Sequence, residues 1–294
     1  MAKQPEKKKD EVETTGHSWD GIEEYNNPLP KWWVWIFYAT IIWGVGYTIA
    51  YPAWPGINQA TSGLLNWSTR ENVADEIESF SERNAPKNTE LEEVELASFV
   101  EEETDSELYS YARSSGAALY QTWCAQCHGS GAAGGVGYPN LQDDDWLWGG
   151  TIEDIHTTIR VGVRNPETDE DYERVSEMPA FGADELLGEE EVEQVVNYVM
   201  SMSGEPRDAS LVEAGEEVYL DNCASCHGDD GEGDTFQGAP NLADAIWLYG
   251  GDYASIRETV WNSRYGVMPQ WQDRLSDAQM RALAVYVHQL GGGE

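Results

Sequence analysis

The four cysteines of this chain fall into two closely spaced pairs. In each pair, two residues separate the thiols and a histidine follows the second cysteine at once. The two motifs are Cys124, Cys127 and His128, and Cys223, Cys226 and His227. C-x-x-C-H is the signature of c-type haem attachment. The spacing allows both thiols to add to the two vinyl groups of one haem and places the imidazole beside the iron.

Two other interpretations of paired cysteines fit less well. Zinc ribbons usually separate their cysteine pairs by about 15–20 residues, whereas 95 residues lie between Cys127 and Cys223. A redox-active dithiol normally belongs to a βαβ unit, and this sequence shows no such pattern. The histidine after both pairs therefore favours two covalently bound c-type haems, each with one iron.

The sixth iron ligands are predicted to be Met178 and Met268. Each lies downstream of one attachment motif, and each precedes a proline. A thioether opposite histidine raises the reduction potential of a c-type haem. Proline fixes φ and stops a helix, which suits a loop lying against the haem face.

The rival ligands do not recur between the two halves of the chain. His156 aligns with Arg257, and His288 aligns with Met200, so both histidines are interpreted as structural or surface residues. The other methionines lie within helical patterns and are interpreted as core residues: Met200, Met202 and Met280.

The two motifs belong to an internal repeat. The motif recurs at an offset of 99 residues, and Pro139-Asn140-Leu141 recurs as Pro240-Asn241-Leu242. We predict two domains, 108–204 and 211–294, with extra residues around 165–176 in the first. Periodicity predicts helices around 152–161, 189–202, 253–261 and 277–290. Strand patterns are scarce, so the fold class is mainly α.

Several residues near the motifs are candidates for contact with haem. Pro139 and Pro240 are predicted to offer backbone carbonyls to the ring N–H groups of the two motif histidines, which would fix the tautomer. A simple turn is the alternative at both positions. Aromatic side chains follow each proline and either contact haem or pack in the core: Trp146, Trp148, Trp247 and Tyr249.

An apolar segment near the N-terminus is predicted to span a membrane. No charged residue occurs from Trp32 to Trp54, and about 20 apolar residues span a bilayer. A cleaved signal peptide would have a shorter apolar region of about 7–15 residues. We therefore predict a cytoplasmic segment at 1–31, which carries lysines, and a transmembrane helix at 32–55. The chain beyond it is expected on the outer side.

The composition is strongly acidic, with a formal net charge of −37 from 17 basic and 54 acidic residues. Such a surface repels nucleic-acid phosphates. It would attract a basic protein partner, or it serves as a solvated, salt-adapted surface. An acidic connector is predicted at 56–107, without a core pattern of its own.

The sequence contains no candidate catalytic residues. We find no nucleophile–base pair and no glycine-rich loop for a nucleotide. If histidine and methionine occupy both faces of each iron, no position stays open for a substrate. This pattern favours electron transfer over catalysis within the chain.

The segment before and within the apolar run carries a more specific signal. It reads Gly16-His17-Ser18-Trp19-Asp20-Gly21-Ile22-Glu23-Glu24, followed by Asn26-Asn27-Pro28-Leu29-Pro30-Lys31-Trp32-Trp33. With the two motifs in order, the chain resembles the dihaem subunits, CcoP or FixP, of the cbb3-type cytochrome c oxidases.

The resemblance implies a role in a proton-pumping oxygen reductase of a bacterial inner membrane. Electrons would come from a soluble cytochrome c or a cytochrome bc complex and pass to a monohaem cytochrome c subunit, then to the catalytic haem–copper subunit. It also implies His/Met ligation in each domain, with His128 matched to Met178 and His227 to Met268. The segment 17–33 would contact the catalytic subunit, and the apolar helix would contact lipid.

Other functions remain open at this point. A free-standing, membrane-anchored dihaem shuttle would not need the segment 17–33. A cytochrome subunit of a periplasmic dehydrogenase often carries three haems, whereas two attachment motifs exist here. A haem sensor would need an open iron position.

Overall fold

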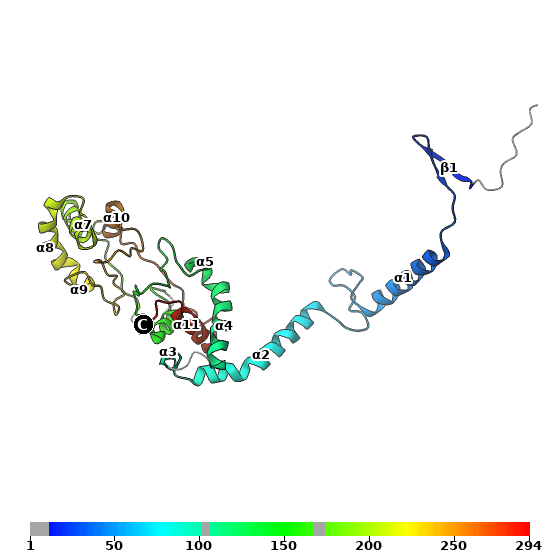
Figure 1. Cartoon of the computed structure of the whole chain (residues 1–294), viewed down its shortest axis with the longest axis horizontal. Coiled ribbons are helices and arrows are strands. Elements are labelled where there is room, and N and C mark those ends of the chain that lie inside the picture. The colour runs from blue at the N-terminus through cyan, green and yellow to red at the C-terminus, as the bar shows by residue number, and fades with distance from the viewer. Residues whose placement is uncertain (1–11, 102–105, 167–173) are drawn as a thin grey trace, which may run out of the picture. The chain divides into compact units, whose positions relative to one another are not determined.

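The computed structural model describes residues 12–101, 106–166 and 174–294. It divides into two compact units, Met1–Glu82 and Arg83–Glu294, which are described separately (Figure 1). Within the described residues the one sheet is a two-stranded hairpin, and the other regular elements are helices. The mainly α fold class is thus confirmed. The predicted insertion around 165–176 falls partly outside the described residues.

The first unit begins with an antiparallel hairpin of β1 (Thr14–Trp19) and β2 (Ile22–Tyr25). Trp19 pairs with Ile22 across a two-residue turn, in which Asp20 and Gly21 both have positive φ, at 53° and 81°. Tight hairpin turns need this left-handed backbone, which favours Asp-Gly. The hairpin side chains are all exposed in the unit.

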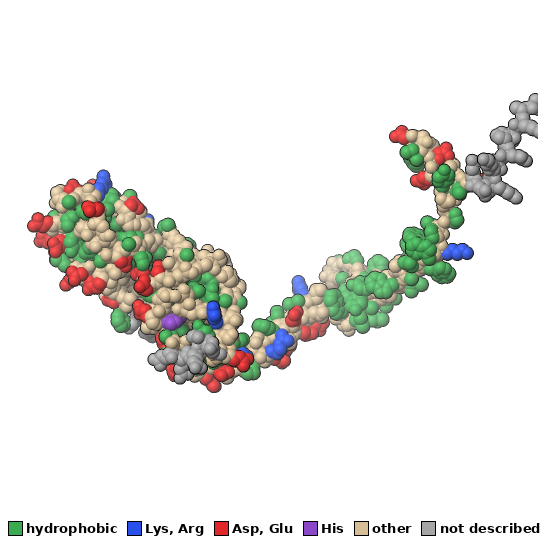
Figure 2. All heavy atoms as spheres, viewed as in Figure 1, with side chains coloured by type: hydrophobic (Ala, Val, Ile, Leu, Met, Phe, Trp, Pro, Cys, Tyr) green, Lys and Arg blue, Asp and Glu red, His purple; other side chains and the backbone are tan. Residues whose placement is uncertain are grey.

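The apolar segment forms helix α1 (Lys31–Ala50), and it is long and apolar enough to cross a membrane. Pro30 precedes its first turn, and Pro52 lies two residues after its last residue, Ala50. None of its side chains is buried in the unit; Figure 2 shows hydrophobic side chains covering it. Such a surface is stable in lipid and unfavourable in water.

The connector contains a long helix, α2 (Thr69–Glu93), and a short one, α3 (Ser98–Glu101). Its C-terminal part differs from the sequence expectation, because Leu91 is fully buried and Leu96 is 6% exposed. Both side chains join a hydrophobic cluster with residues far along the chain. The end of the acidic connector is therefore part of a core.

Four helices of the second unit, α6, α7, α10 and α11, match those expected from the sequence to within two residues. The helices of this unit are α4 (Glu107–Trp123), α5 (Ala125–His128), α6 (Ile152–Val161), α7 (Glu189–Ser203), η1 (Ala209–Leu211), α8 (Val212–Asn222), α9 (Ala224–His227), α10 (Tyr253–Asn262) and α11 (Asp277–His288). Side-chain caps start several of them: Ser106 accepts from Tyr109 N, and Thr151 accepts from Asp154 N. Such caps satisfy backbone donors that a helix start leaves unpaired.

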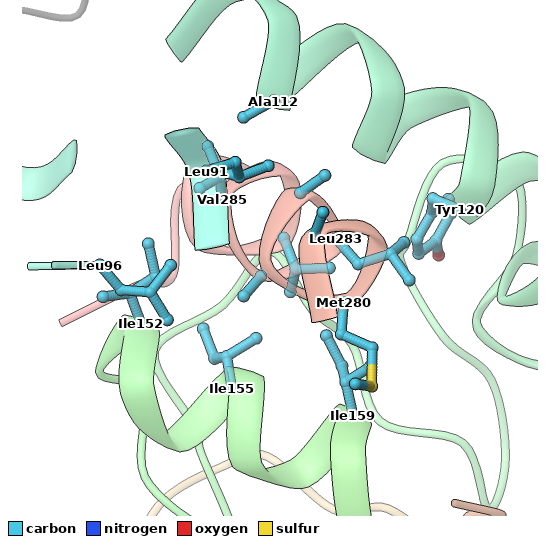
Figure 3. Close-up of a cluster of buried hydrophobic side chains, with 14 of the residues drawn as sticks. Leu91, Leu96, Ala112, Tyr120, Ile152, Ile155, Ile159, Met280, Leu283 and Val285 are labelled. Atoms are coloured by element: carbon cyan, nitrogen blue, oxygen red, sulfur yellow. The ribbon is translucent and has the colours of Figure 1, made fainter. Parts of the chain in front are cut away.

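One hydrophobic cluster, here called core one, forms where α4 packs on α11, with α6 against α11 (Figure 3). At the crossing, a Cβ on Gly116 would overlap the carbonyl oxygen of Ala282. The rings of Tyr120 and Tyr286 pack beside this point with centroids 5.4 Å apart. Core one therefore joins the start of the first repeat to the end of the second.

The other cluster, core two, forms where α7 packs on α8 and α10. A Cβ on Gly215 would overlap the carbonyl oxygen of Gln194, and the rings of Tyr198 and Tyr219 lie 5.2 Å apart. The helix crossing repeats that of core one. Here, however, the last helix of the first repeat, α7, packs on the first helix of the second repeat, α8.

This arrangement differs from the expectation that each repeat packs as its own domain. The last helix of each repeat, α7 or α11, packs on the first helix of the other repeat, α8 or α4. The connection from α7 to η1 and α8 covers only residues 204–208. Helices joined by so short a connection usually pack as antiparallel neighbours. Because α7 packs on α8, the apolar face of α4 is covered by α11.

Candidate haem-attachment sites

Each attachment motif lies on a one-turn helix directly after a longer helix. Cys124 ends α4 and begins α5, and its carbonyl accepts hydrogen bonds from Cys127 N at 3.1 Å and His128 N at 3.0 Å. The carbonyl of Cys223 accepts from Cys226 N and His227 N at the same two distances. One helical turn thus places both thiols and the imidazole on a short, rigid segment.

The thiols of each pair have different environments. Cys124 and Cys223 are partly buried, whereas Cys127 and Cys226 are exposed, and all four are free thiols. Burial, with a smaller effect of the neighbouring cysteine, raises the pKa of Cys124 to about 11 and that of Cys223 to about 12. The raised pKa values keep both buried thiols protonated at neutral pH.

Each motif histidine has a backbone carbonyl beside one ring nitrogen, an arrangement that favours the tautomer an iron ligand needs. His128 Nδ1 lies 3.1 Å from Pro139 O, and His227 Nδ1 lies 3.0 Å from Pro240 O. An Nδ1–H group donating to the carbonyl leaves the Nε2 lone pair available for a metal. Burial lowers the pKa of both imidazoles, an effect larger than the opposing hydrogen bond. The predicted proline contacts are confirmed.

A buried tyrosine holds the loop that follows each motif. Tyr120 donates to Gly129 O at 2.8 Å, and Tyr219 donates to Gly228 O at 2.7 Å. Both side chains are fully buried, and burial raises the pKa of Tyr120 to about 12. Each hydroxyl stays protonated and fixes the loop end of its motif.

Each of the two methionines packs beside the attachment motif of the other repeat. Met268 packs against core one together with Cys124, and Met178 packs against core two together with Cys223. The segment of Met268 pairs with Val163 at the end of α6. Ser263, at the end of α10, donates to Met178 O. This placement favours Met268 at the first motif and Met178 at the second, in place of the expected matching of His128 with Met178 and of His227 with Met268.

A cavity of about 420 Å³, within the size range of cofactor sites, lies between core two and the loop 133–147 of the first repeat. Its walls include both thiols of the second motif, His227 and Met178. Apolar side chains complete much of the wall, among them Phe181, Leu242 and Val260. Two thiols, an imidazole and a thioether around one apolar cavity fit a c-type haem.

The rival histidines have other hydrogen-bond partners, and the rival methionine Met280 is a core residue. His156 Nε2 is 3.2 Å from Asp277 Oδ1, and His288 Nε2 is 3.0 Å from Glu294 O. Met280 is 4% exposed in core one. Across the described ranges, no three side chains of the His, Cys, Asp and Glu types gather as a metal site. The zinc alternative therefore gains no support.

The aromatic residues after the prolines have distinct positions. Trp146 donates to Gly292 O, and its ring leaves no room for a Cβ on Gly150. Trp148 lies over Gly238, and Tyr249 lies over Gly137, so the loops of the two repeats interlock. The indole N–H of Trp148 is buried and has no hydrogen-bond partner among the described residues.

Two family models match the chain. The model "N-terminal domain of cytochrome oxidase-cbb3, FixP" matches residues 11–58, and the model "Cytochrome C oxidase, cbb3-type, subunit III" matches residues 112–199 and 210–287. The subunit CcoP of Cereibacter sphaeroides is 56% identical over 100% of both chains, and CcoP of Rhodobacter capsulatus is 51% identical over 100% of both. FixP of Sinorhizobium medicae is 51% identical over 96% of both.

These observations define a c-type cytochrome with tandem haem-binding modules and an apolar N-terminal helix that fits membrane anchoring. More narrowly, the chain belongs to the CcoP/FixP family, the subunits of the cbb3-type cytochrome c oxidases. The resemblance found in the sequence is thereby confirmed. The other subunits of the oxidase are its partners.

Proposed function

We propose that this chain is the dihaem electron relay of a cbb3-type oxidase. It would take electrons from a soluble cytochrome c or a cytochrome bc complex and deliver them, through a monohaem cytochrome c subunit, to the haem–copper subunit. The observation that carries this proposal is the repetition of one arrangement: a thiol pair, a proline-oriented imidazole and a methionine from the other repeat.

The proposed haem contacts follow from this arrangement. Cys124 and Cys127 would hold one haem between His128 and Met268, and Cys223 and Cys226 would hold the other between His227 and Met178. When bound, each haem supplies a one-electron couple. The chain's own residues hold the imidazole tautomer, exclude water with apolar walls and fill both axial positions. Filled axial positions support a non-catalytic subunit.

The proposed topology places the N-terminal segment 1–31 in the cytoplasm and the haem-binding repeats in the periplasm. The lysines on the N-terminal side of α1 support this orientation, since cytoplasmic flanks carry the basic residues. Lipid would surround α1. Reporter fusions check the orientation: alkaline phosphatase joined after Glu294 is expected to be active, and joined after Asn26 to be inactive.

The decisive experiment is purification of the tagged chain in mild detergent, with a reduced-minus-oxidised spectrum and oxygen uptake of the copurified material. We expect b-type haem and oxygen consumption together with two c-type haems per chain. If c-type haem alone appears and no oxygen is consumed, the free-standing shuttle becomes the better interpretation.

A further inference from the structure

Two arginines, Arg164 and Arg264, line the cavity of core two together with His227 and Met178. Among the described residues of the cavity wall, they are the only lysine or arginine side chains. The whole chain has 17 basic residues against 54 acidic ones. Two cations in the wall of one cavity, in so acidic a chain, indicate a specific electrostatic task.

Both guanidinium groups have neutral hydrogen-bond partners. Arg164 donates from Nε to Ser176 O at 2.7 Å, and Arg264 donates from Nη2 to Ser255 O at 2.5 Å. In the described parts of the chain neither group forms an ion pair. The ion-paired arginines lie outside the cavity wall: Arg174, Arg257 and Arg281.

Aromatic rings hold the two guanidinium groups in place. Arg264 lies 4.9 Å from the ring centroid of Tyr249, and Arg164 lies 5.8 Å from that of Trp148 and 5.7 Å from that of Tyr265. Contacts of this kind orient a cation without neutralising it. Burial lowers the pKa of Arg164, yet a guanidinium keeps its charge at neutral pH.

One carboxylate of the cavity wall acts on these cations only through its charge: Glu177 partly offsets the effect of burial on the pKa of Arg164 but forms no ion pair with it. Asp143, Asp145 and Glu177 line the same cavity, and none is ion-paired with either arginine. Burial, reinforced by nearby aspartates, raises the pKa of Asp145 to about 6. The wall is therefore already rich in negative charge, and a ligand that brings more carboxylates needs dedicated cations.

We propose that Arg164 and Arg264 bind the two propionate carboxylates of the haem attached at Cys223 and Cys226. A guanidinium fork matches a carboxylate in two parallel hydrogen bonds, and the cavity offers two forks. Because positive charge beside the propionates disfavours the ferric state, the pair also raises the reduction potential of that haem. This inference rests on the haem contacts given under the proposed function.

The test compares Arg164→Gln and Arg264→Gln with Arg257→Gln. Arg257 lies on α10 outside the cavity and is paired with Glu193, so its loss changes the net charge equally. Spectroelectrochemical titration of the detergent-solubilised complex gives the midpoint potential of each haem. We expect each cavity variant to change the ferric/ferrous equilibrium of the core-two haem about tenfold, or about 59 mV lower for one electron.

The lysine variants separate charge from folding. Arg164→Lys and Arg264→Lys keep the cation. We therefore expect the midpoint potential of the core-two haem to fall by no more than half as much as in the glutamine variants. The proposal is overturned if the glutamine variants shift no more than Arg257→Gln, or if the lysine variants fall as far as the glutamine variants.

A haem count distinguishes this inference from the proposed function. If the wild-type chain holds two c-type haems by pyridine haemochrome and the shifts are absent, the arginine assignment alone is wrong. If the wild-type chain lacks haem at Cys223 and Cys226, the proposed haem contacts are wrong.

Discussion

Core two draws on one continuous stretch of the chain, whereas core one draws on the segments at either side of it. The residues of core two run from Met178 to Trp261. Those of core one run from Leu91 to Ile159 and again from Met268 to Leu290. Along the chain, the segment that forms core two therefore lies between the two segments that form core one, although the two repeats follow one another in the sequence.

Because of this order of segments, the two cores differ in the sequence separation of their contacts and hence in their expected folding rates. In core two, the helix that closes the core and the candidate methionine precede the attachment motif. All its parts are available once α10 is complete. In core one, α4 stays uncovered until α11 has been made. Closing contacts over so long a separation costs more chain entropy and slows folding. Core two is expected to fold first.

A fragment comparison would test this order of segments most directly, since its outcome is present or absent. Residues 176–266 contain the whole of core two, and residues 211–294 contain the second repeat as the sequence defines it. When matured with haem, the first fragment is expected to give a low-spin His/Met spectrum and cooperative thermal unfolding. The second is expected to lack both. The opposite result would show that each repeat folds on its own.

Methionine replacements address the same comparison in the whole chain. Met268→Ala should lower the potential of the haem at Cys124 and Cys127, while Met178→Ala should lower that at Cys223 and Cys226. Axial ligands span about 0.8 V, so a fall on the order of 0.2 V is expected. Redox titration in a Cys124→Ser/Cys127→Ser background, which keeps one haem, identifies the affected site. If Met268→Ala lowers the potential of the haem that remains in this background, then Met268 belongs with His227, as the sequence suggested.

The sequence predicted the chemistry of each motif but not the pairing of the motifs with the methionines. C-x-x-C-H and Met-Pro are local signals, and the proline carbonyls follow each histidine closely. The identity of the helix that covers α4 is a non-local property, and two similar repeats offer the same hydrophobic pattern to either partner. The short connection 204–208 was the available signal, because it favours packing of α7 on α8.

The burial of the connector's C-terminal end was also not predicted, again because it depends on residues distant in the sequence. Leu91 and Leu96 lie among acidic residues, and neither belongs to a repeating apolar stripe. Their burial depends on α11, almost two hundred residues later. By contrast, the helix predicted at 32–55 is present as α1, although it ends earlier, at Ala50, because length and apolarity are properties of the segment itself.

Truncation of the connector leucine should weaken core one selectively. Leu91 is fully buried, and Leu91→Ala is expected to lower the free energy of unfolding by about 2–4 kcal/mol. Ile77→Ala is the matched control, because Ile77 lies on the same helix with 64% exposure; it should change stability by less than about 0.5 kcal/mol. Chemical denaturation followed at each haem separates the cores. A loss of stability in core two alone would contradict the assignment of Leu91.

The smallest expected effect concerns a polar contact found at core two. Glu193 on α7 accepts from Tyr253 and is paired with Arg257 at 2.8 Å. The hydrogen bond from Tyr253, followed by the contacts with Arg257, lowers the pKa of Glu193. A carboxyl whose folded pKa is lowered stabilises the fold above its unfolded pKa, near 4.5, and loses this contribution as the pH falls through the folded value.

Glu193→Gln should therefore lower the stability of core two at pH 7 by no more than about 1 kcal/mol, since solvent reaches about a third of each side chain of the pair and screens it. The difference between variant and wild type should shrink as the pH drops below 4.5, because the wild-type carboxyl becomes protonated. Thermal unfolding from pH 7 to pH 3 measures this convergence. A difference that stays constant over this range would mean that the side chain acts through packing or a neutral hydrogen bond. Core one should be unaffected at every pH, because α7 closes only core two.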